Sequence, residues 1–448
     1  MNQKIENIFF LGIGGIGMSA LARYFLAQGH IISGYDKTKT PLTLEMEDKG
    51  INIYYEDKIQ NIIHTPDYVI YTPAIPKDNL IFNHLKALEI PFYKRAEILG
   101  NISKEYFTIA VAGTHGKTTI TSLIAHILQF NNQPIIAFIG GICKNYSSNF
   151  LLSKNPKIMV VEADEFDRSF LTLHPDIAIV SSMDADHLDI YGTKDFLKES
   201  FFMFTKQIKN NGLLIINDGL EIAKDLKVNF QKYSVEKATS IIANNAKVIN
   251  GNTHFTLTIN GEYSQEIETF LPGIHNILNI SAAVAACYHL GISDLQIAEA
   301  VKTYKGVQRR FDQRIKRDDV VYIDDYAHHP AEIAATLKAV KSIYPAKKIT
   351  VIFQPHLFSR TRDFGDDFAK SLSIADQVLL MEIYPAREKP IKGINSQWLL
   401  DKITSKEKQI VDFDNVVETI IKNQTQVLLT LGAGNIDLII KPIEEALS

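Results

Sequence analysis

The first hundred residues show the hydrophobic pattern of an α/β unit. An apolar run from Ile8 to Leu11 meets a cluster of glycines. Apolar residues then recur at helical spacing, at Met18, Leu21, Ala22 and Phe25. The segments 30–36 and 67–76 are typical of short strands, and the second ends in a proline-bounded loop. We therefore expect a strand, a glycine turn and a helix to open one domain over residues 1–100.

The same pattern starts again near residue 101. Phe107 to Ala112 predicts a buried strand, and one face of the next helix carries Ile120, Leu123, Ile124, Ile127 and Leu128. Further apolar strands are expected within 157–164, 176–187 and 212–218. Short alternating segments between 228 and 271 predict an antiparallel edge or a small inserted sheet. A second domain over 101–308 follows.

After residue 308, four apolar segments each run into a polar loop, with helical stretches such as 331–343 between them. This repeat predicts a third domain over 309–448 with a mostly parallel sheet. The fold class is therefore α/β with three domains. Because ligands of such sheets gather beyond the carboxyl ends of the strands, the polar loops are the places to look for chemistry.

Composition narrows the class of protein. At 448 residues the chain is long enough for two to four domains, and a net charge of −4 gives no basic field for nucleic acid. Cys143 and Cys287 are too few for a disulfide framework, which fits a reducing cytosol. The apolar start has Glu6 before it and glycines within it, so we do not interpret it as a signal peptide. No apolar run is long enough for a membrane span, and we expect a cytoplasmic protein.

The strongest single motif is "AGTHGKTT", which follows the strand that ends at Ala112. Gly113 and Gly116 allow backbone N–H groups to turn toward a phosphate, Lys117 supplies a cation and Thr118 offers a hydroxyl to Mg²⁺. The loop is shorter than a Walker loop, and the alternative is a tight turn with a solvated lysine. Strand, loop and helix in this order favour an ATP site. Its residues are Gly113, Thr114, His115, Gly116, Lys117, Thr118 and Thr119.

An acidic segment follows the next predicted strand and contains Glu162, Asp164, Glu165 and Asp167. A Mg²⁺ ion on phosphates usually takes one or two carboxylates, and Glu162 is the best placed. The alternative is a solvated acidic loop. His187 has acidic neighbours, which suggests a second metal position, although a histidine after a strand is commonly structural.

The glycine cluster at residues 12–17 satisfies G-x-G-x-x-G, and Asp36 ends the following strand. This arrangement predicts a diphosphate at a helix N-terminus and a carboxylate near a ribose. The motif does not specify the nucleotide, so NAD(P) remains open.

Polar residues also cluster in the last third of the chain, at Asp324, Asp325, His328, His329, His356, Arg360 and Arg362. Paired arginines suit carboxylate or phosphate ligands, while the alternative is a set of ion pairs that tie loops together. Asn276 and Asn279 lie three residues apart on one helical face, where their amides would cap the helix or read a purine edge.

In their order along the chain, the motifs resemble those of the Mur ligase family. They are "GIGGIGM", "TPAIP", "AGTHGKTT", "VEADEFDRSFL", "DADHLD", "GIHNILNISAA", "RRFD", "DDYAHHP", "FQPHLFSRTRDF", "YPAREKP" and "GAGNI". Each motif is weak alone, but the ordered set covers essentially the whole chain. The resemblance implies a Rossmann-like UDP-binding domain, a central P-loop ATP-binding domain and a C-terminal Rossmann-like domain for the amino acid and nucleotide.

By this resemblance, the chain is an ATP- and Mg²⁺-dependent ligase of peptidoglycan precursor synthesis. It would join L-alanine to the lactyl carboxylate of UDP-N-acetylmuramate through an acyl phosphate, and we expect a monomer or a weak homodimer. Magnesium ligands would be Thr118, Glu162 and His187; further ATP contacts would be Asn276, Asn279, Arg310 and Asp325. UDP-sugar contacts would be Gly12, Gly14, Gly15, Gly17, Met18, Asp36 and Thr72. The catalytic set would be Lys117, His187, His329, His356, Arg360 and Arg362.

Two positions depart from the family pattern. Leu357 stands where many relatives carry a basic residue, and Ala327 stands where glycine is frequent. Both leave the ligand candidates in place but blur the shape of the alanine pocket. No lysine can be assigned as a carbamylated metal bridge.

Three other functions compete with this hypothesis. A murein-peptide ligase would add a ready-made tripeptide to the same sugar nucleotide, although the turn at residues 14–18 looks more like that of the alanine-adding branch. A folylpolyglutamate synthase would have no use for the N-terminal domain. An NAD-dependent oxidoreductase with an ATP-regulated second domain would bind nicotinamide measurably.

Overall fold

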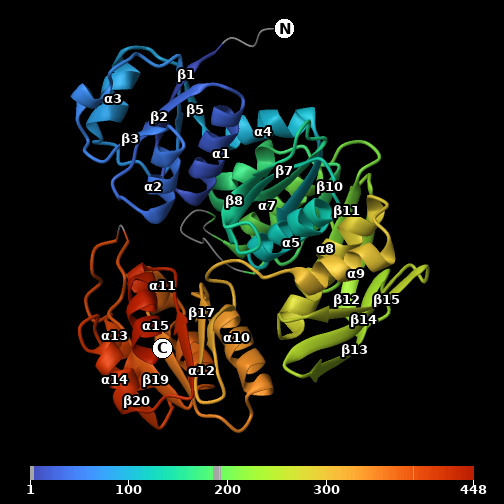
Figure 1. Cartoon of the computed structure of the whole chain (residues 1–448), viewed down its shortest axis with the longest axis vertical. Helices are drawn as coiled ribbons and strands as arrows, with labels where there is room; N and C mark the ends of the chain where they lie inside the picture. The colour runs from blue at the N-terminus through green and yellow to red at the C-terminus, as the bar shows by residue number, and fades with distance from the viewer. Residues whose placement is uncertain (1–4, 185–190, 192, 387) are drawn as a thin grey trace. The chain divides into compact units, whose positions relative to one another are not determined.

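The computed structural model describes residues 5–184, 191, 193–386 and 388–448, and it contains three β-sheets (Figure 1). The first sheet has five parallel strands in the order β3-β2-β1-β4-β5. Its strands are β1 (Asn7–Leu11), β2 (Ile31–Tyr35), β3 (Asn52–Tyr54), β4 (Tyr68–Tyr71) and β5 (Phe92–Lys94). Its helices are α1 (Ile16–Ala27), α2 (Pro41–Asp48), η1 (Ile59–Asn61), α3 (Leu80–Ala87) and α4 (Arg95–Glu105). The strand order reverses at β1, which is where such sheets bind ligands.

The second sheet has ten strands in the order β15-β14-β13-β12-β11-β10-β6-β9-β7-β8. Six of its strands are β6 (Phe107–Ala112), β7 (Ile135–Cys143), the edge strand β8 (Ser148–Leu152), β9 (Ile158–Ala163), β10 (Ile177–Val180) and β11 (Leu213–Asn217). The segment predicted as an edge or an inserted sheet forms β12 (Asn229–Val235), β13 (Ile241–Ile249), β14 (Asn252–Ile259) and β15 (Tyr263–Thr269). These four strands extend the same sheet to its edge.

Helices α5 (Lys117–Phe130), η2 (Phe166–Thr172), α7 (Lys194–Thr205), α8 (Ile274–His289) and α9 (Asp294–Thr303) accompany this sheet. The apolar face predicted for α5 is fully buried, and this helix packs on β7 and β9. That packing fixes the start of α5 at the carboxyl end of β6, which pairs in parallel with β9 and β10.

The third sheet has six strands in the order β16-β17-β21-β18-β19-β20, and only β16 runs antiparallel to its neighbour. Its strands are β16 (Asp312–Lys316), β17 (Val321–Asp325), β18 (Ile349–Phe353), β19 (Gln377–Leu380), β20 (Glu407–Ile410) and β21 (Val427–Leu431). Its helices are α10 (Pro330–Ile343), α11 (Phe358–Asp363), α12 (Gly365–Leu372), α13 (Ser396–Lys402), α14 (Val416–Lys422), η3 (Asn435–Ile439) and α15 (Ile440–Leu447). The mostly parallel third domain is therefore confirmed.

The chain divides into two compact units, and the first of them contains both glycine-rich turns. Unit 1 comprises Met1–Asn244, Leu257–Gln265 and Leu278–Tyr304; the remaining residues form unit 2. Within unit 1, one hydrophobic core runs from β1 and α1 to β6 and β9 without interruption. The α/β class with three sheet-based domains agrees with the sequence, while the exact boundaries at 100 and 308 stay predictions.

Three hydrogen bonds of Asn149 show how closely the first two sheets are joined inside unit 1. The buried amide of Asn149 donates to the carbonyl oxygen of Ile16 at 2.6 Å and to Ser19 Oγ at 3.0 Å. Its oxygen accepts a hydrogen bond from Arg23 at 3.0 Å. Helix α1 also packs on β7 and β8 (Figure 1). Among the described residues, no helix combines the length and apolar character that a membrane crossing requires.

Candidate active site

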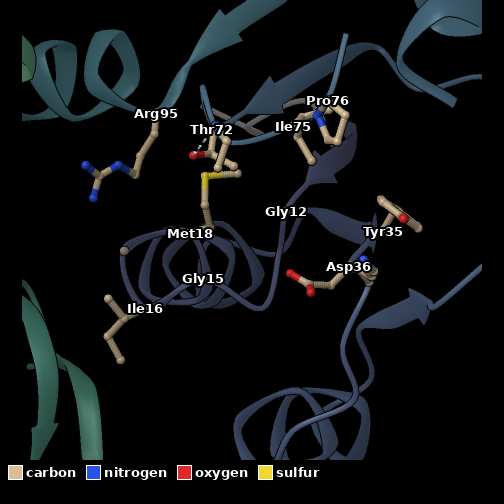
Figure 2. Close-up of a pocket in the computed structure, with 13 residues that line it drawn as sticks. Gly12, Gly15, Ile16, Met18, Tyr35, Asp36, Thr72, Ile75, Pro76 and Arg95 are labelled. Atoms are coloured by element: carbon tan, nitrogen blue, oxygen red, sulfur yellow. Dashed lines mark hydrogen bonds between the residues drawn. The ribbon is translucent and has the colours of Figure 1, made fainter. Parts of the chain in front are cut away.

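A pocket of about 450 Å³ opens at the carboxyl ends of the first sheet (Figure 2). It lies at the reversal of strand order, as expected for a nucleotide site. Its lining residues come from the glycine turn, from the ends of β2 and β4 and from the start of α4: Gly12, Gly15, Ile16, Gly17, Met18, Tyr35, Asp36, Lys37, Thr72, Ala74, Ile75, Pro76 and Arg95. Six of the seven residues predicted for the UDP-sugar thus line one cavity.

The seventh residue, Gly14, does not line the pocket but contacts Asp36, which does. Its N–H donates a 2.8 Å hydrogen bond to Asp36 Oδ2, and a Cβ at this position would come within 2.8 Å of the same oxygen. Gly12 has a φ of +83°, and a Cβ there would lie 2.5 Å from Thr72 Cγ2. The two glycines therefore allow Asp36 and Thr72 to approach the turn.

Arg95 is a pocket residue that the sequence analysis did not identify. It begins α4, and a Cβ on Gly17 would overlap its Nη1 atom. Arg95 Nη2 also lies 3.3 Å from Asp164 Oδ2, in the acidic segment after β9. The sequence offered no signal for this contact because the two residues are 69 positions apart.

The phosphate loop lies between β6 and α5, as predicted. Gly113 and Gly116 have φ angles of +135° and +85°, which only glycine adopts without strain. Two serines after β10, which the sequence analysis also missed, hold the loop. Ser182 Oγ accepts a 2.8 Å hydrogen bond from the N–H of His115 and lies 2.9 Å from Thr114 Oγ1, while Ser181 Oγ donates to the carbonyl oxygen of His115.

Lys117 lies at the start of α5 and contacts three oxygen atoms, the carbonyl oxygen of Gly113 and both carboxylate oxygens of Glu165. Its Nζ donates to the carbonyl oxygen of Gly113 at 2.7 Å and lies 2.9 Å from the carboxylate of Glu165, whose side chain is only 1% exposed. Burial lowers the pKa of Lys117, but the carboxylates of Glu165, Asp164 and Glu162 outweigh it and raise the pKa above its ordinary value. Lys117 therefore stays protonated, and its ammonium group carries the positive charge that an anion would require.

The predicted metal ligands are partly described. Thr118 is buried in the first turn of α5, and Glu162 lies in β9 opposite Val111 of β6. The N–H of Gly140 donates a 2.6 Å hydrogen bond to Glu162 Oε1, which leaves room for only a glycine at position 140. His187, predicted as a third ligand, lies outside the described residues. Among the residues described, no three His, Cys, Asp or Glu side chains form a metal cluster.

The hydroxyl of Thr118 and the carboxylate of Glu162 suit a magnesium ion, and they do not suit a metal that is held by protein ligands alone. Mg²⁺ bound to phosphates takes one or two carboxylates and keeps several waters, so one hydroxyl and one carboxylate beside a phosphate loop are an adequate protein contribution. A structural zinc site would need four nitrogen or sulfur ligands. Thr118 and Glu162 thus have the chemistry that a phosphate-bound Mg²⁺ needs, and their role as its ligands stays a prediction.

The two asparagines of α8 have different surroundings. Asn279 lies against the phosphate loop, because a Cβ on Gly116 would overlap its Oδ1 atom. Asn276 donates a 2.8 Å hydrogen bond to the carbonyl oxygen of Pro272, just before the helix. This contact is not a helix cap, because a capping side chain accepts a hydrogen bond from an N–H of the first turn, and Asn279 is the amide that lies at the phosphate loop.

In unit 2, Asp325 ends β17 and organises the loop before it. Its carboxylate accepts 2.8 Å hydrogen bonds from the N–H groups of Phe311 and Ala327. Burial raises its pKa to about 6, although the charge of Arg310 acts in the opposite direction. The guanidinium of Arg310 lies over the ring of Tyr326, 4.9 Å from its centroid. These contacts hold Arg310 and Asp325 in one loop cluster of unit 2.

The remaining histidines and arginines of the predicted catalytic set lie beyond β17 and β18. His329 caps α10, and its N–H donates to Glu332 Oε2 at 3.2 Å. The ring of His356 stacks on Tyr384 with centroids 5.7 Å apart. Arg360 and Arg362 both belong to the short helix α11, and Arg362 pairs with Asp363 at 2.7 Å. Asp363 is the next residue of the same helix, so this exposed pair joins no two loops, and the role of Arg362 stays a prediction.

Comparison with known proteins gives the context of these sites. The family model "Mur ligase family, catalytic domain" matches residues 7–107, and "Mur ligase middle domain" matches 111–287. The model "Mur ligase, glutamate ligase domain" matches 309–434. A UDP-N-acetylmuramate--L-alanine ligase of Flavobacterium johnsoniae is 46% identical over 451 residues, which cover 100% of this chain and 99% of that protein. The chain belongs to the Mur ligase family.

Other Mur ligases give the same result. A UDP-N-acetylmuramate--L-alanine ligase of Flavobacterium psychrophilum is 47% identical over 99% of both chains. The crystal structure of UDP-N-acetylmuramate-alanine ligase MurC from Thermotoga maritima matches with a TM-score of 0.86 and 28% identity, covering 99% of both chains. A murein peptide ligase from Psychrobacter arcticus, at 23% identity and a TM-score of 0.72 over 99% and 98% of the two chains, shows the common fold alone.

Proposed function

We propose that the chain is an ATP-dependent ligase that joins L-alanine to the lactyl carboxylate of UDP-N-acetylmuramate, a step of peptidoglycan precursor synthesis. One observation supports it most directly: unit 1 carries two separate phosphate-type turns, one after β1 and one after β6. A ligase that activates the acid of a sugar nucleotide with ATP needs a site for each. The full-length relatives that bear this activity in their names supply the substrate assignment.

The pocket of the first sheet would hold the acceptor. Its glycine turn leads into the N-terminus of α1, where backbone N–H groups and the helix dipole favour a diphosphate. Asp36 lies at the end of β2, where a carboxylate commonly accepts hydrogen bonds from a ribose. Figure 2 shows Asp36 and Tyr35 on one side of the pocket and Arg95 on the other.

In the first half-reaction, a lactyl oxygen attacks the γ-phosphorus of ATP and the bond to the β,γ-bridging oxygen breaks. The products are an acyl phosphate and ADP. Such transfers depend on positioning and on neutralisation of charge more than on covalent chemistry. The protonated Lys117 would exchange the Gly113 carbonyl and Glu165 for phosphate oxygens, while Gly113 and Gly116 direct backbone N–H groups at them.

Thr118 and Glu162 are the described residues that would hold Mg²⁺ on the phosphates. When bound, this ion neutralises charge on the transferring phosphoryl group. His187 keeps its predicted role as a further ligand on the strength of the motif alone.

In the second half-reaction, the amine of L-alanine attacks the acyl carbon, the C–O bond to phosphate breaks and the amine loses a proton. We propose His329, His356, Arg360 and Arg362 as the residues that bind alanine and the acyl phosphate. Paired guanidinium groups suit both anions, and a histidine can accept the released proton. Arg310 and Asp325 are proposed as additional nucleotide contacts on the family motif.

The defining experiment measures release of inorganic phosphate with each component omitted in turn. We expect release only when ATP, Mg²⁺, UDP-N-acetylmuramate and an amino acid are all present. A panel of L-alanine, glycine, L-serine and the cell-wall tripeptide then identifies the second substrate. Release that ignores the sugar nucleotide would contradict the proposal, and preference for the tripeptide would favour a murein-peptide ligase.

A second experiment separates the two turns. Lys117→Ala should abolish phosphate release while binding of UDP-N-acetylmuramate, measured by calorimetry, stays within about twofold of wild type. The reason is that Lys117 contacts only atoms of the phosphate loop and the acidic segment in the described structure. Loss of both activities in a folded variant would contradict two separate sites. We further propose a cytoplasmic monomer or weak homodimer, which sedimentation at several concentrations would test.

A further inference from the structure

Arg95 contributes a permanent positive charge to the acceptor pocket. Its guanidinium lies against the first turn of α1 so closely that a Cβ on Gly17 would be 3.1 Å from Cζ. In Figure 2, Arg95 and Asp36 occupy opposite sides of the pocket, and Gly15 and Met18 lie between them. A cation beside a helix N-terminus strengthens the attraction for an anion that binds there.

The same guanidinium has a second partner outside the pocket. Its Nη2 atom lies 3.3 Å from Asp164 Oδ2, and the two side chains are 26% and 37% exposed. Asp164 lies between Glu162 and Glu165, so it belongs to the segment that contacts Lys117. Arg95 therefore links the acceptor pocket to the acidic segment of the phosphate-loop site.

We propose that Arg95 binds the diphosphate of the UDP-sugar and gives up Asp164 when it does so. The inference rests on the proposed function, because it assumes a nucleoside diphosphate in this pocket. A guanidinium commonly binds a phosphate through two parallel N–H donors. We therefore expect the Nη2 side of Arg95, which contacts Asp164, to turn toward the ligand. Binding of the UDP-sugar thus releases the carboxylate of Asp164, which belongs to the segment that contacts Lys117.

A neighbouring ion pair shows what a purely structural link looks like. Lys94 and Asp167 lie next to Arg95 and Asp164 in the same two segments, with their charged atoms 3.0 Å apart. Lys94 does not line the pocket. It therefore serves as a matched control, because it joins the same segments and has no access to the ligand.

The first test measures binding of UDP by calorimetry. We expect Arg95→Gln to weaken UDP binding roughly 10- to 100-fold, Arg95→Lys to recover part of the loss, and Lys94→Gln to stay within about twofold. Uridine, which has no phosphate, should bind all four proteins alike. Unchanged UDP binding by Arg95→Gln would overturn the inference, as would a loss seen only with UDP-N-acetylmuramate, since that result would assign Arg95 to the lactyl carboxylate. If the wild type itself bound no UDP or UDP-sugar, the proposed function would fail as well.

The second test measures the exchange itself. Asp164→Asn removes the competing charge and should tighten UDP binding about two- to fivefold, as expected for a partly exposed pair. In the Arg95→Gln background the same substitution should have no effect, because the competition has already been removed. An equal effect in both backgrounds would overturn the exchange, and unfolding curves of all variants would verify that each is folded.

Discussion

The ammonium group of Lys117 lies 2.9 Å from the carboxylate of Glu165, a side chain that is 1% exposed. The lysine of the phosphate loop is therefore held by a buried charge 48 residues later in the chain. An ion pair of this kind is costly to break on one side, because the remaining charge is left in a low-dielectric site.

Substitution of Glu165 by Gln should destabilise the protein by about 3 kcal/mol, since it leaves Lys117 without its buried countercharge. ATP should restore more stability to this variant than to the wild type, because the phosphates supply the missing negative charge. Urea unfolding with and without ATP measures both effects. Asp167→Asn, which breaks an exposed pair, is the control and should cost less than about 1 kcal/mol. Equal costs for the two variants would contradict the buried ion pair.

Gly113 should not tolerate a side chain. A Cβ there would lie 2.9 Å from the backbone nitrogen of Ser182 and would overlap Ser181 Oγ, and its φ is +135°. Gly113→Ala should therefore lose more than about 3 kcal/mol of stability or lose ATP binding outright. Gly29→Ala provides the comparison: its φ is +90° but no atom lies within 4 Å of the added carbon, so the cost should be only about 1–2 kcal/mol. Similar losses of stability at both positions would show that backbone strain alone, and not the contacts with Ser181 and Ser182, accounts for the cost of Gly113→Ala.

Ser182 should be needed for the shape of the phosphate loop. Its hydroxyl accepts from His115 N–H at 2.8 Å and contacts Thr114 Oγ1 at 2.9 Å, so Ser182→Ala removes two links to the loop. We expect the KM for ATP to rise roughly five- to tenfold, as for the loss of about 1 kcal/mol of binding. Thr205→Val removes a buried hydroxyl that donates to the carbonyl oxygen of Phe202 within α7, and it should leave this KM unchanged. A rise in both variants would indicate a general loss of stability.

The buried imidazole of His126 should make stability depend on pH. Burial lowers its pKa from 6.5 to about 4, although a bond to the carbonyl oxygen of Ala300 acts in the opposite direction. The unfolded chain then binds more protons between these values, so this contribution is complete above pH 6.5 and is lost as the pH falls toward 4. The difference corresponds to roughly 3 kcal/mol. Urea unfolding from pH 4.5 to 7.5 should show a flatter profile for His126→Gln than for wild type; parallel profiles would contradict it.

Sequence pattern was sufficient where the signal was local. The strand Phe107–Ala112 and the buried face of α5 followed from an apolar run and from helical spacing, and both glycine turns followed from their motifs. The strands β7 and β8 were not predicted, because the glycines at positions 140 and 141 interrupt the apolar run. The glycine at position 140 has a reason that only the sheet reveals, since Glu162 packs on Gly140.

Residues that support the sites were missed because their partners are remote in sequence. Ser182 meets His115 only because β10 pairs with β6, and Glu165 meets Lys117 only because β9 pairs with β6 on its other side. Arg95 reaches the glycine turn from another helix. Strand order decides all three contacts, and no periodicity along the chain encodes it. Among four neighbouring carboxylates, the sequence therefore favoured Glu162 and gave no role to Glu165.

The uninterrupted hydrophobic core beneath the first two sheets has a consequence for how this enzyme loses its structure. Asn149 and Arg23 form a hydrogen bond between the two sheets, and the residues of both sheets share one apolar core. Cleavage of the chain between Glu105 and Phe107 would therefore expose apolar interior surface on each fragment. Neither fragment should persist alone. The acceptor pocket and the phosphate loop should therefore belong to one cooperative unit, and heat or denaturant should unfold both in a single transition.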